Sequence, residues 1–98
     1  MKENFKDKQI DDLFKGVLTL KSVDECYDFF EDLCTVAELH ELSRRLSAAV
    51  MLQKGQTYAQ IASGTGVSTA TISRVKRGLR TGNAPYKRVV KMLAEEDK

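Results

Sequence analysis

Apolar residues recur every three or four positions along most of the chain, and no segment alternates apolar and polar residues as a half-buried strand would. The pattern therefore predicts an all-α fold. Residues 1–9 are polar, and we expect them to be frayed. A first helix should begin at residue 10 and end near residues 19–21. Its apolar positions form one stripe: Ile10, Leu13, Phe14, Val17 and Leu18.

Two capping boxes predict where the next two helices begin. Ser22 with Glu25, and Thr35 with Glu38, each combine an N-cap hydroxyl with a carboxylate three residues later. The helix after Thr35 should run to about residue 54 and stop at Gly55, because glycine suits the position that follows a helix.

The helix after Ser22 carries three aromatic side chains: Tyr27, Phe29 and Phe30. A domain of 98 residues buries a smaller share of its surface than a larger one, so one monomer cannot easily cover this apolar area. We interpret these residues as core plus subunit interface. A ligand pocket is the alternative.

Residues 58–75 predict two short helices joined by a tight turn at Gly66, where a positive φ costs glycine little. Ala62 is small enough to let the second helix cross close over the first, and Ser68 can cap the second helix. The buried face of that helix holds Ile72 and Val75. An ordinary helical hairpin is the alternative. The small residue, the glycine, the apolar positions and an outer face without Asp or Glu together favour a helix-turn-helix. Thr65 departs from the pattern, since the last inward position of the first helix is usually aliphatic.

The chain is predicted to be a single domain, residues 1–98. We expect N-terminal dimerisation helices over residues 1–34, a long central helix over 35–55, the helix-turn-helix over 57–79 and a C-terminal helix over 84–95. A loop should occupy residues 80–83, and Pro85 suits the first turn of the last helix.

Composition indicates a globular protein, with 42% hydrophobic and 31% charged residues. No apolar run approaches the ~20 residues of a membrane span, and the N-terminus lacks the apolar segment of a signal peptide. We therefore expect a cytoplasmic protein without membrane association. Cys26 and Cys34 have no metal-site spacing and are expected to be reduced, half-buried thiols. His40, the only histidine, is expected to be a surface residue.

Charge is distributed unevenly along the chain, although the net charge is only +2. Residues 1–34 hold five Lys and nine acidic residues, a net charge of −4. Residues 68–98 hold eight Lys or Arg and three acidic residues, a net charge of +5. A positive field on one side of a groove-reading helix suits contacts to DNA phosphates, whereas a merely solvated basic face is the alternative.

Catalytic motifs do not appear in the sequence. There is no paired carboxylate in an apolar setting, no Ser/His/Asp set, no metal-ligand cluster and no complete phosphate loop. We therefore expect neither an enzyme nor a cofactor or metal site.

The order of parts from Thr35 to Leu93 resembles the Trp repressor family, and most closely its TrpR-like YerC/YecD branch. A long helix ends at Lys54-Gly55, a reader segment follows over residues 66–74, and Ala84-Pro85 opens a closing helix. The most specific matches are Ala70-Thr71-Ile72-Ser73-Arg74 and Ala84-Pro85. The resemblance implies a six-helix, intertwined homodimer whose two reader helices enter major grooves about one helical turn, roughly 34 Å, apart.

The resemblance also places a ligand pocket. The two arginines that sandwich the indole in the tryptophan sensor fall at Arg45 and Arg74. Val75 stands where the sensor has glycine, and Gly78 stands where it has the serine that helps to hold the ligand's amino group. Overpacking costs ~1–3 kcal/mol and a lost hydrogen bond to a charged group ~1.5–3 kcal/mol. We therefore hypothesise that Val75 fills the pocket and that no tryptophan corepressor is needed.

Taken together, these features predict a sequence-specific transcriptional regulator, a dimeric repressor that binds palindromic double-stranded DNA. Its expected contacts are Ser68, Thr69, Ala70, Thr71, Ser73, Arg74, Lys76, Arg77 and Arg80, with Lys54 and Gln56 as further backbone contacts. Two alternatives remain. One is a repressor gated by tryptophan or another small molecule bound near Arg45, Arg74, Val75 and Gly78. The other is a helical protein-interaction module without DNA affinity.

Overall fold

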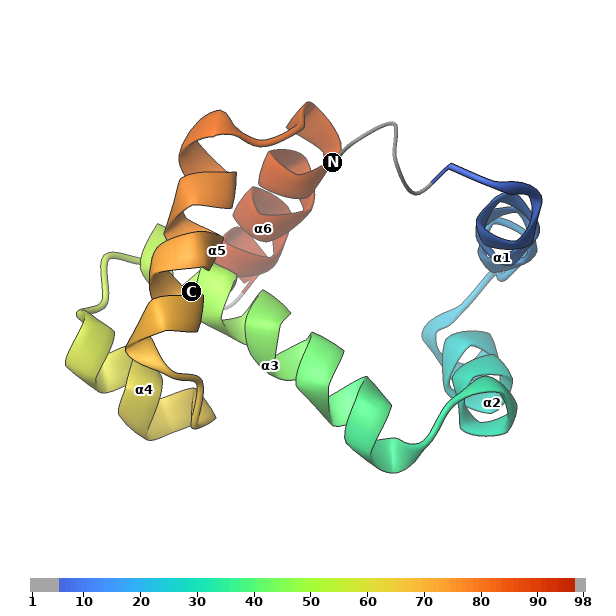
Figure 1. Cartoon of the computed structure of the whole chain (residues 1–98), viewed down its shortest axis with the longest axis horizontal. Coiled ribbons are helices and arrows are strands. Elements are labelled where there is room, and N and C mark those ends of the chain that lie inside the picture. Colours follow the sequence, from blue (N-terminus) through green and yellow to red (C-terminus); the bar gives the residue numbers. More distant parts are fainter. Residues whose placement is uncertain (1–5, 97–98) are drawn as a thin grey trace. The chain divides into compact units, whose positions relative to one another are not determined.

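Six helices and no strand make up the part of the chain that the computed structural model describes, residues 6–96 (Figure 1). This confirms the predicted six-helix, all-α fold. The helices are α1 (Lys8–Val17), α2 (Val23–Leu33), α3 (Val36–Gln53), α4 (Tyr58–Thr65), α5 (Thr69–Thr81) and α6 (Ala84–Glu96). A first compact unit ends at Val36, and a second begins at Ala37. None of these helices combines the length and hydropathy that a bilayer crossing requires.

Helix α1 begins two residues earlier than the apolar stripe predicted. The Asp7 carboxylate accepts a hydrogen bond from the Ile10 amide at 2.8 Å and caps the helix, so Lys8 and Gln9 are helical. The expectation of a frayed segment is therefore wrong for these two residues, and residues 1–5 lie outside the described part. The helix also ends earlier than expected, at Val17.

The apolar faces of α1 and α2 stay uncovered in the single chain. Neither helix contains a buried residue, although Phe29 and Phe30 make an edge-to-face ring contact at 5.2 Å. Leu18 is 84% exposed. Other exposed apolar residues are Phe14, Val23, Tyr27 and Leu33. Both cysteines are free and half-buried, as predicted.

The core of the second unit forms around the C-terminal half of α3. Ala48, fully buried, packs with Ile61 of α4 and Ile72 of α5. The next two residues, Ala49 and Val50, belong to a second cluster with Val75 of α5 and with Val90 and Ala94 of α6. Alanine at consecutive buried positions leaves room for the neighbouring helices to approach α3 closely. Three consecutive residues of α3, numbers 48–50, therefore hold the three helices that follow it.

Helix α5 lies between α4 and α6 and contacts both (Figure 1). It extends to Thr81, so the expected loop at residues 80–83 is wrong for Arg80 and Thr81. Two local bonds explain the extra turn: the Gly82 amide donates to the Gly78 carbonyl at 2.8 Å, and the Thr81 hydroxyl donates to the Arg77 carbonyl at 3.0 Å. Helix propagation, once nucleated, needs little from side-chain pattern.

Candidate nucleic-acid interface

The turn between α4 and α5 has the predicted geometry. Gly66 has a φ of 77°, in the left-handed region, and its amide donates to the Ala62 carbonyl at 2.9 Å. At the other end of α4, Thr57 and Gln60 form a complete capping box. Both ends of α4 are thus fixed by local hydrogen bonds, and the direction in which the chain enters α5 is fixed with them.

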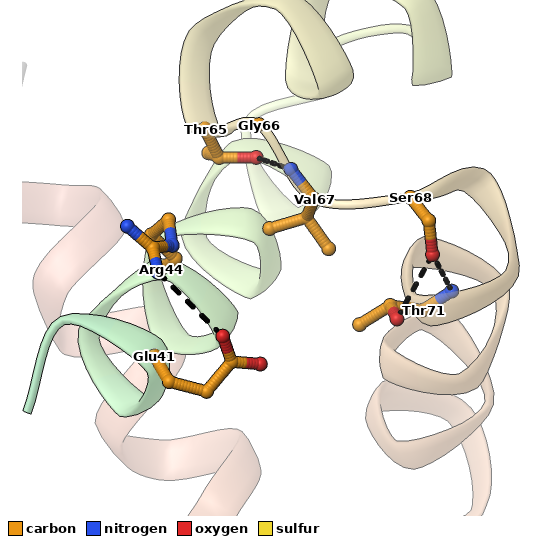
Figure 2. A pocket seen from close by; sticks show the side chains of 7 residues that line it. All are labelled: Glu41, Arg44, Thr65, Gly66, Val67, Ser68 and Thr71. Atoms are coloured by element: carbon orange, nitrogen blue, oxygen red, sulfur yellow. Dashed lines mark hydrogen bonds and ion pairs between the residues drawn. The ribbon is translucent and has the colours of Figure 1, made fainter. Parts of the chain in front are cut away.

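Two hydrogen bonds explain why Thr65 stands where an aliphatic residue was expected. Its hydroxyl donates to the Ile61 carbonyl at 2.8 Å. The same hydroxyl accepts from the Val67 amide at 3.1 Å (Figure 2). The side chain therefore ties the last turn of α4 to the residue after Gly66. An aliphatic residue would leave this Val67 amide without its acceptor.

The beginning of α5 is organised by two hydroxyl groups. The Ser68 hydroxyl accepts from the Thr71 amide at 3.2 Å, which confirms the predicted cap, and it donates to the Thr71 hydroxyl at 3.1 Å (Figure 2). The Thr71 hydroxyl is left with its own proton to donate. It can therefore offer a hydrogen bond to a base edge or a bridging water at the N-terminus of the helix.

The rest of α5 divides into an apolar inner face and a polar outer face. Ile72 and Val75 are buried on the inner face, as predicted. The predicted contact residues are exposed, except for the half-buried Thr71: Ser68, Thr69, Ala70, Ser73, Arg74, Lys76, Arg77 and Arg80. No Asp or Glu occurs in the sequence between Glu41 and Glu95. The outer face of α5 is therefore hydroxylic at its beginning and cationic from Arg74 onward.

A shallow hollow of about 290 Å³ opens on the side of α5 that faces α4. Its lining comprises Tyr58, Ser73, Lys76, Arg77 and Arg80. The Lys76 ammonium lies 5.7 Å from the centroid of the Tyr58 ring. Farther along, the Lys87 ammonium donates to the Arg80 carbonyl at 3.2 Å. Four basic side chains therefore gather around the C-terminal half of α5.

A second hollow, of about 360 Å³, lies between α3 and the turn (Figure 2). It is lined by Glu41 and Arg44 of α3 and by Thr65, Gly66, Val67, Ser68 and Thr71. Glu41 pairs with both neighbouring arginines, at 3.6 Å to Arg44 and 3.3 Å to Arg45. The guanidinium of Arg45, one of the two predicted indole-binding groups, thus already has a carboxylate partner.

None of the four predicted ligand-pocket residues, Arg45 included, lines either hollow. Val75 is only 8% exposed and packs among residues of α3 and α6. Gly78 faces Tyr86 of α6, since a Cβ at Gly78 would lie 3.5 Å from the Tyr86 ring. Burial raises the pKa of the Tyr86 phenol above its ordinary value. Arg74 is exposed on α5.

Two residues that shape this surface, Tyr58 and Glu41, were not predicted from the sequence. Thr65 was recognised as a departure from the pattern, but its hydrogen bonds were not foreseen. A tyrosine directly after the N-cap of the first motif helix was a usable signal, because that position lies beside the reader helix. Glu41 was detectable from its spacing, since it precedes Arg44 and Arg45 by three and four residues on one helix. Lys54 and Gln56, which were predicted as further contacts, lie in the connection between α3 and α4.

Comparison with known proteins places this arrangement in a family. The model of the Trp repressor protein family matches residues 8–94. YerC of Bacillus subtilis (strain 168) is 46% identical over 95 residues, which cover 97% of this chain and 91% of YerC. A solved TrpR-like protein from Eubacterium eligens ATCC 27750 is 49% identical, with a TM-score of 0.83 over 93% of this chain and 94% of the other. A solved structure from Staphylococcus aureus is 48% identical, with a TM-score of 0.82 over 93% and 91% of the two chains. The chain is therefore a member of the Trp repressor family, in its YerC-like branch.

Proposed function

We propose that this protein is a sequence-specific, DNA-binding transcriptional regulator that acts in the cytoplasm as a homodimeric repressor of palindromic sites. The observation that carries the proposal is the outer face of α5, which is exposed, free of carboxylates, hydroxylic at its beginning and basic beyond it. Membership of a family of regulators supports this function rather than an enzymatic one.

The roles divide along α5. Thr69, Ala70, Thr71 and Ser73 are the proposed contacts to base edges, directly or through water, with the alanine methyl available to a thymine methyl. Arg74 and the later basic residues are the proposed contacts to phosphates, which position the helix without reading sequence. Base contacts are assigned to the start of α5 because its short hydroxylic side chains let the helix approach the floor of the major groove. Phosphate contacts are assigned to the longer basic side chains that follow.

Dimerisation is proposed from the uncovered apolar faces of α1 and α2. A monomer that leaves several large apolar side chains more than half exposed on two helices is unusual, because large exposed patches generally mark interfaces. A second copy of the chain would cover them and would also pair two reader helices. A dimer with two-fold symmetry would present one α5 helix to each half-site of a palindromic operator, because the symmetry of the operator mirrors that of the protein.

Tryptophan is not required in the proposed mechanism. Three observations support this: Val75 occupies space among α3 and α6, Gly78 offers no hydroxyl, and Arg45 is engaged by Glu41. We propose that the reader helix is held in its binding pose by this packing alone. A small-molecule-gated repressor would instead need an effector that acts on the reader helix through another site.

Footprinting on genomic fragments, with the Thr71→Ala and Arg77→Ala variants, tests the function. Loss of the Thr71 hydroxyl should relax sequence preference, whereas loss of Arg77 should weaken binding to all sequences and flatten the salt dependence by about 1 unit of slope. If the wild-type chain shows no DNA affinity even at low salt, the protein-interaction module is the better description.

A further inference from the structure

Tyr58 of α4 has no role in the DNA contacts proposed above, although it lies beside one of the residues assigned to them. Its ring packs against the buried cluster of Ala48, Ile61 and Ile72, and it is half-buried there. The ammonium of Lys76 lies 5.7 Å from the ring centroid, within the range of a cation–π interaction. The core thus holds the aromatic ring, and the ring in turn attracts the end of a long, flexible side chain.

The hollow beside this pair concentrates positive charge. Ser73, Lys76, Arg77 and Arg80 share one side of α5, because they are spaced three, four and seven residues from Ser73. Within residues 6–96, no carboxylate is ion-paired with any of the three cations. Like charges around one hollow repel one another, and the attraction of an anion seated among them offsets that repulsion.

We propose that Tyr58 is a positioning residue, which holds Lys76 in place to contact one backbone phosphate of DNA in this hollow. Arg77 and Arg80 complete the cationic rim, and the Ser73 hydroxyl supplies a neutral donor. Lysine loses much rotamer freedom when it is fixed at an interface. A ring that already orders the side chain lowers the part of this cost that binding must overcome. The inference rests on the proposed DNA-binding function and assigns a role to a residue of α4.

The test measures the affinity of the full-length chain for a fluorescently labelled, mixed-sequence DNA duplex by anisotropy across a salt series. Phosphate contacts do not depend on sequence, so the operator need not be known. Tyr58→Leu should weaken binding roughly two- to five-fold at fixed salt, the size of an exposed cation–π contact. Tyr58→Phe keeps the aromatic face and should bind like the wild type. Lys76→Met should lower the salt slope by about 0.9, the value for one phosphate.

Two controls separate positioning from other effects. Lys15→Met removes a charge from the polar face of α1 and should leave the salt slope unchanged. In the Tyr58→Leu background, Lys76→Met should cost less than it does alone, because the two side chains act together. Thermal unfolding followed by circular dichroism verifies that each variant is folded at the assay temperature.

The outcomes distinguish this inference from the function on which it rests. If the wild-type chain does not bind the duplex at low salt, the proposed function fails and the inference fails with it. If the wild type binds and Tyr58→Leu matches it, or Tyr58→Phe is weakened as much as Tyr58→Leu, DNA binding stands and the positioning role is refuted. Equal slope changes for Lys15→Met and Lys76→Met would likewise refute a local phosphate contact.

Discussion

At residue 75, one branched side chain joins the reader helix to two other helices. Val75 packs with Ala49 and Val50 of α3 and with Val90 and Ala94 of α6, so any movement of α5 away from α3 would expose it. By family resemblance, the tryptophan sensor has a glycine at this position. The side chain therefore stabilises the attachment of α5 and, in our proposal, occupies the volume that an indole ring would need.

Val75 leads to a prediction about ligand binding. Isothermal titration of the wild-type chain with L-tryptophan should show no micromolar binding, because the branched side chain overlaps the expected indole position. The double variant Val75→Gly/Gly78→Ser, which restores the sensor's residues, should gain affinity for tryptophan. Its stability should fall by about 1.5–3 kcal/mol, because the burial of one valine side chain is lost. The glycine that enters the helix at position 75 is offset by the glycine that leaves it at position 78. Micromolar binding by the wild type would contradict the filled-pocket hypothesis.

Two glycines affect the stability of helix α5, one in its interior and one at its end. Gly78 lies within α5 and faces Tyr86, and an added Cβ would make ordinary contact with that ring at 3.5 Å. Gly82 ends the helix, and an added Cβ there would overlap the Gly78 carbonyl oxygen. Gly78 therefore weakens the helix interior, whereas Gly82 allows the backbone to leave the helix without a steric clash.

These two glycines make a matched pair of stability predictions. Gly78→Ala should stabilise the protein by about 0.5–1 kcal/mol, because alanine is the better residue inside a helix and its methyl group fits. Gly82→Ala should destabilise it by about 1–3 kcal/mol, because the new methyl group overlaps backbone rather than a movable side chain. Urea unfolding at one fixed protein concentration measures both. Equal shifts in the same direction would contradict this account.

For the whole molecule, the contrast between the two units is the main feature. The second unit has fully buried residues that join α3 to α6, whereas α1 and α2 contain none. The N-terminal segment is also acidic, whereas the segment from residue 68 onward is basic. The chain therefore combines a packed, basic helix-turn-helix unit with two amphipathic helices whose apolar faces are uncovered. Our proposal assigns a second copy of the chain to these faces.

This assignment predicts the oligomeric state. Sedimentation equilibrium should show a dimer. Leu18→Ser removes one buried leucine from each subunit and should weaken the dimer by about 3–6 kcal/mol, or more than roughly 100-fold in dissociation constant. Leu18 is 84% exposed in the single chain, so its replacement has little to disturb in an isolated monomer. Lys15→Ser, on the polar face of α1 and three residues before Leu18, is the matched control. A monomeric wild type, or equal effects of both variants, would refute the assignment.

Local interactions explain why the sequence alone determined so much. Helical periodicity located all six helices, and Thr57, Gly66 and Ser68 fixed the ends of the motif helices through bonds to residues three or four positions away. Such bonds depend only on neighbours in the chain and can therefore be read from spacing. The helix boundaries near Asp7 and Thr81 were less predictable, because single capping bonds shift them by one or two residues.

The tertiary structure decided which groups from different helices meet. The contact of Tyr58 with Lys76, the seat of Val75 between α3 and α6 and the placement of the Tyr86 ring against Gly78 all join residues on separate helices. Such contacts depend on how the helices cross, and crossing geometry follows from the summed packing of many side chains rather than from local pattern. The sequence thus determined that a helix-turn-helix exists and where α5 lies in the chain, and the packing of the helices decided which side chains lie beside α5.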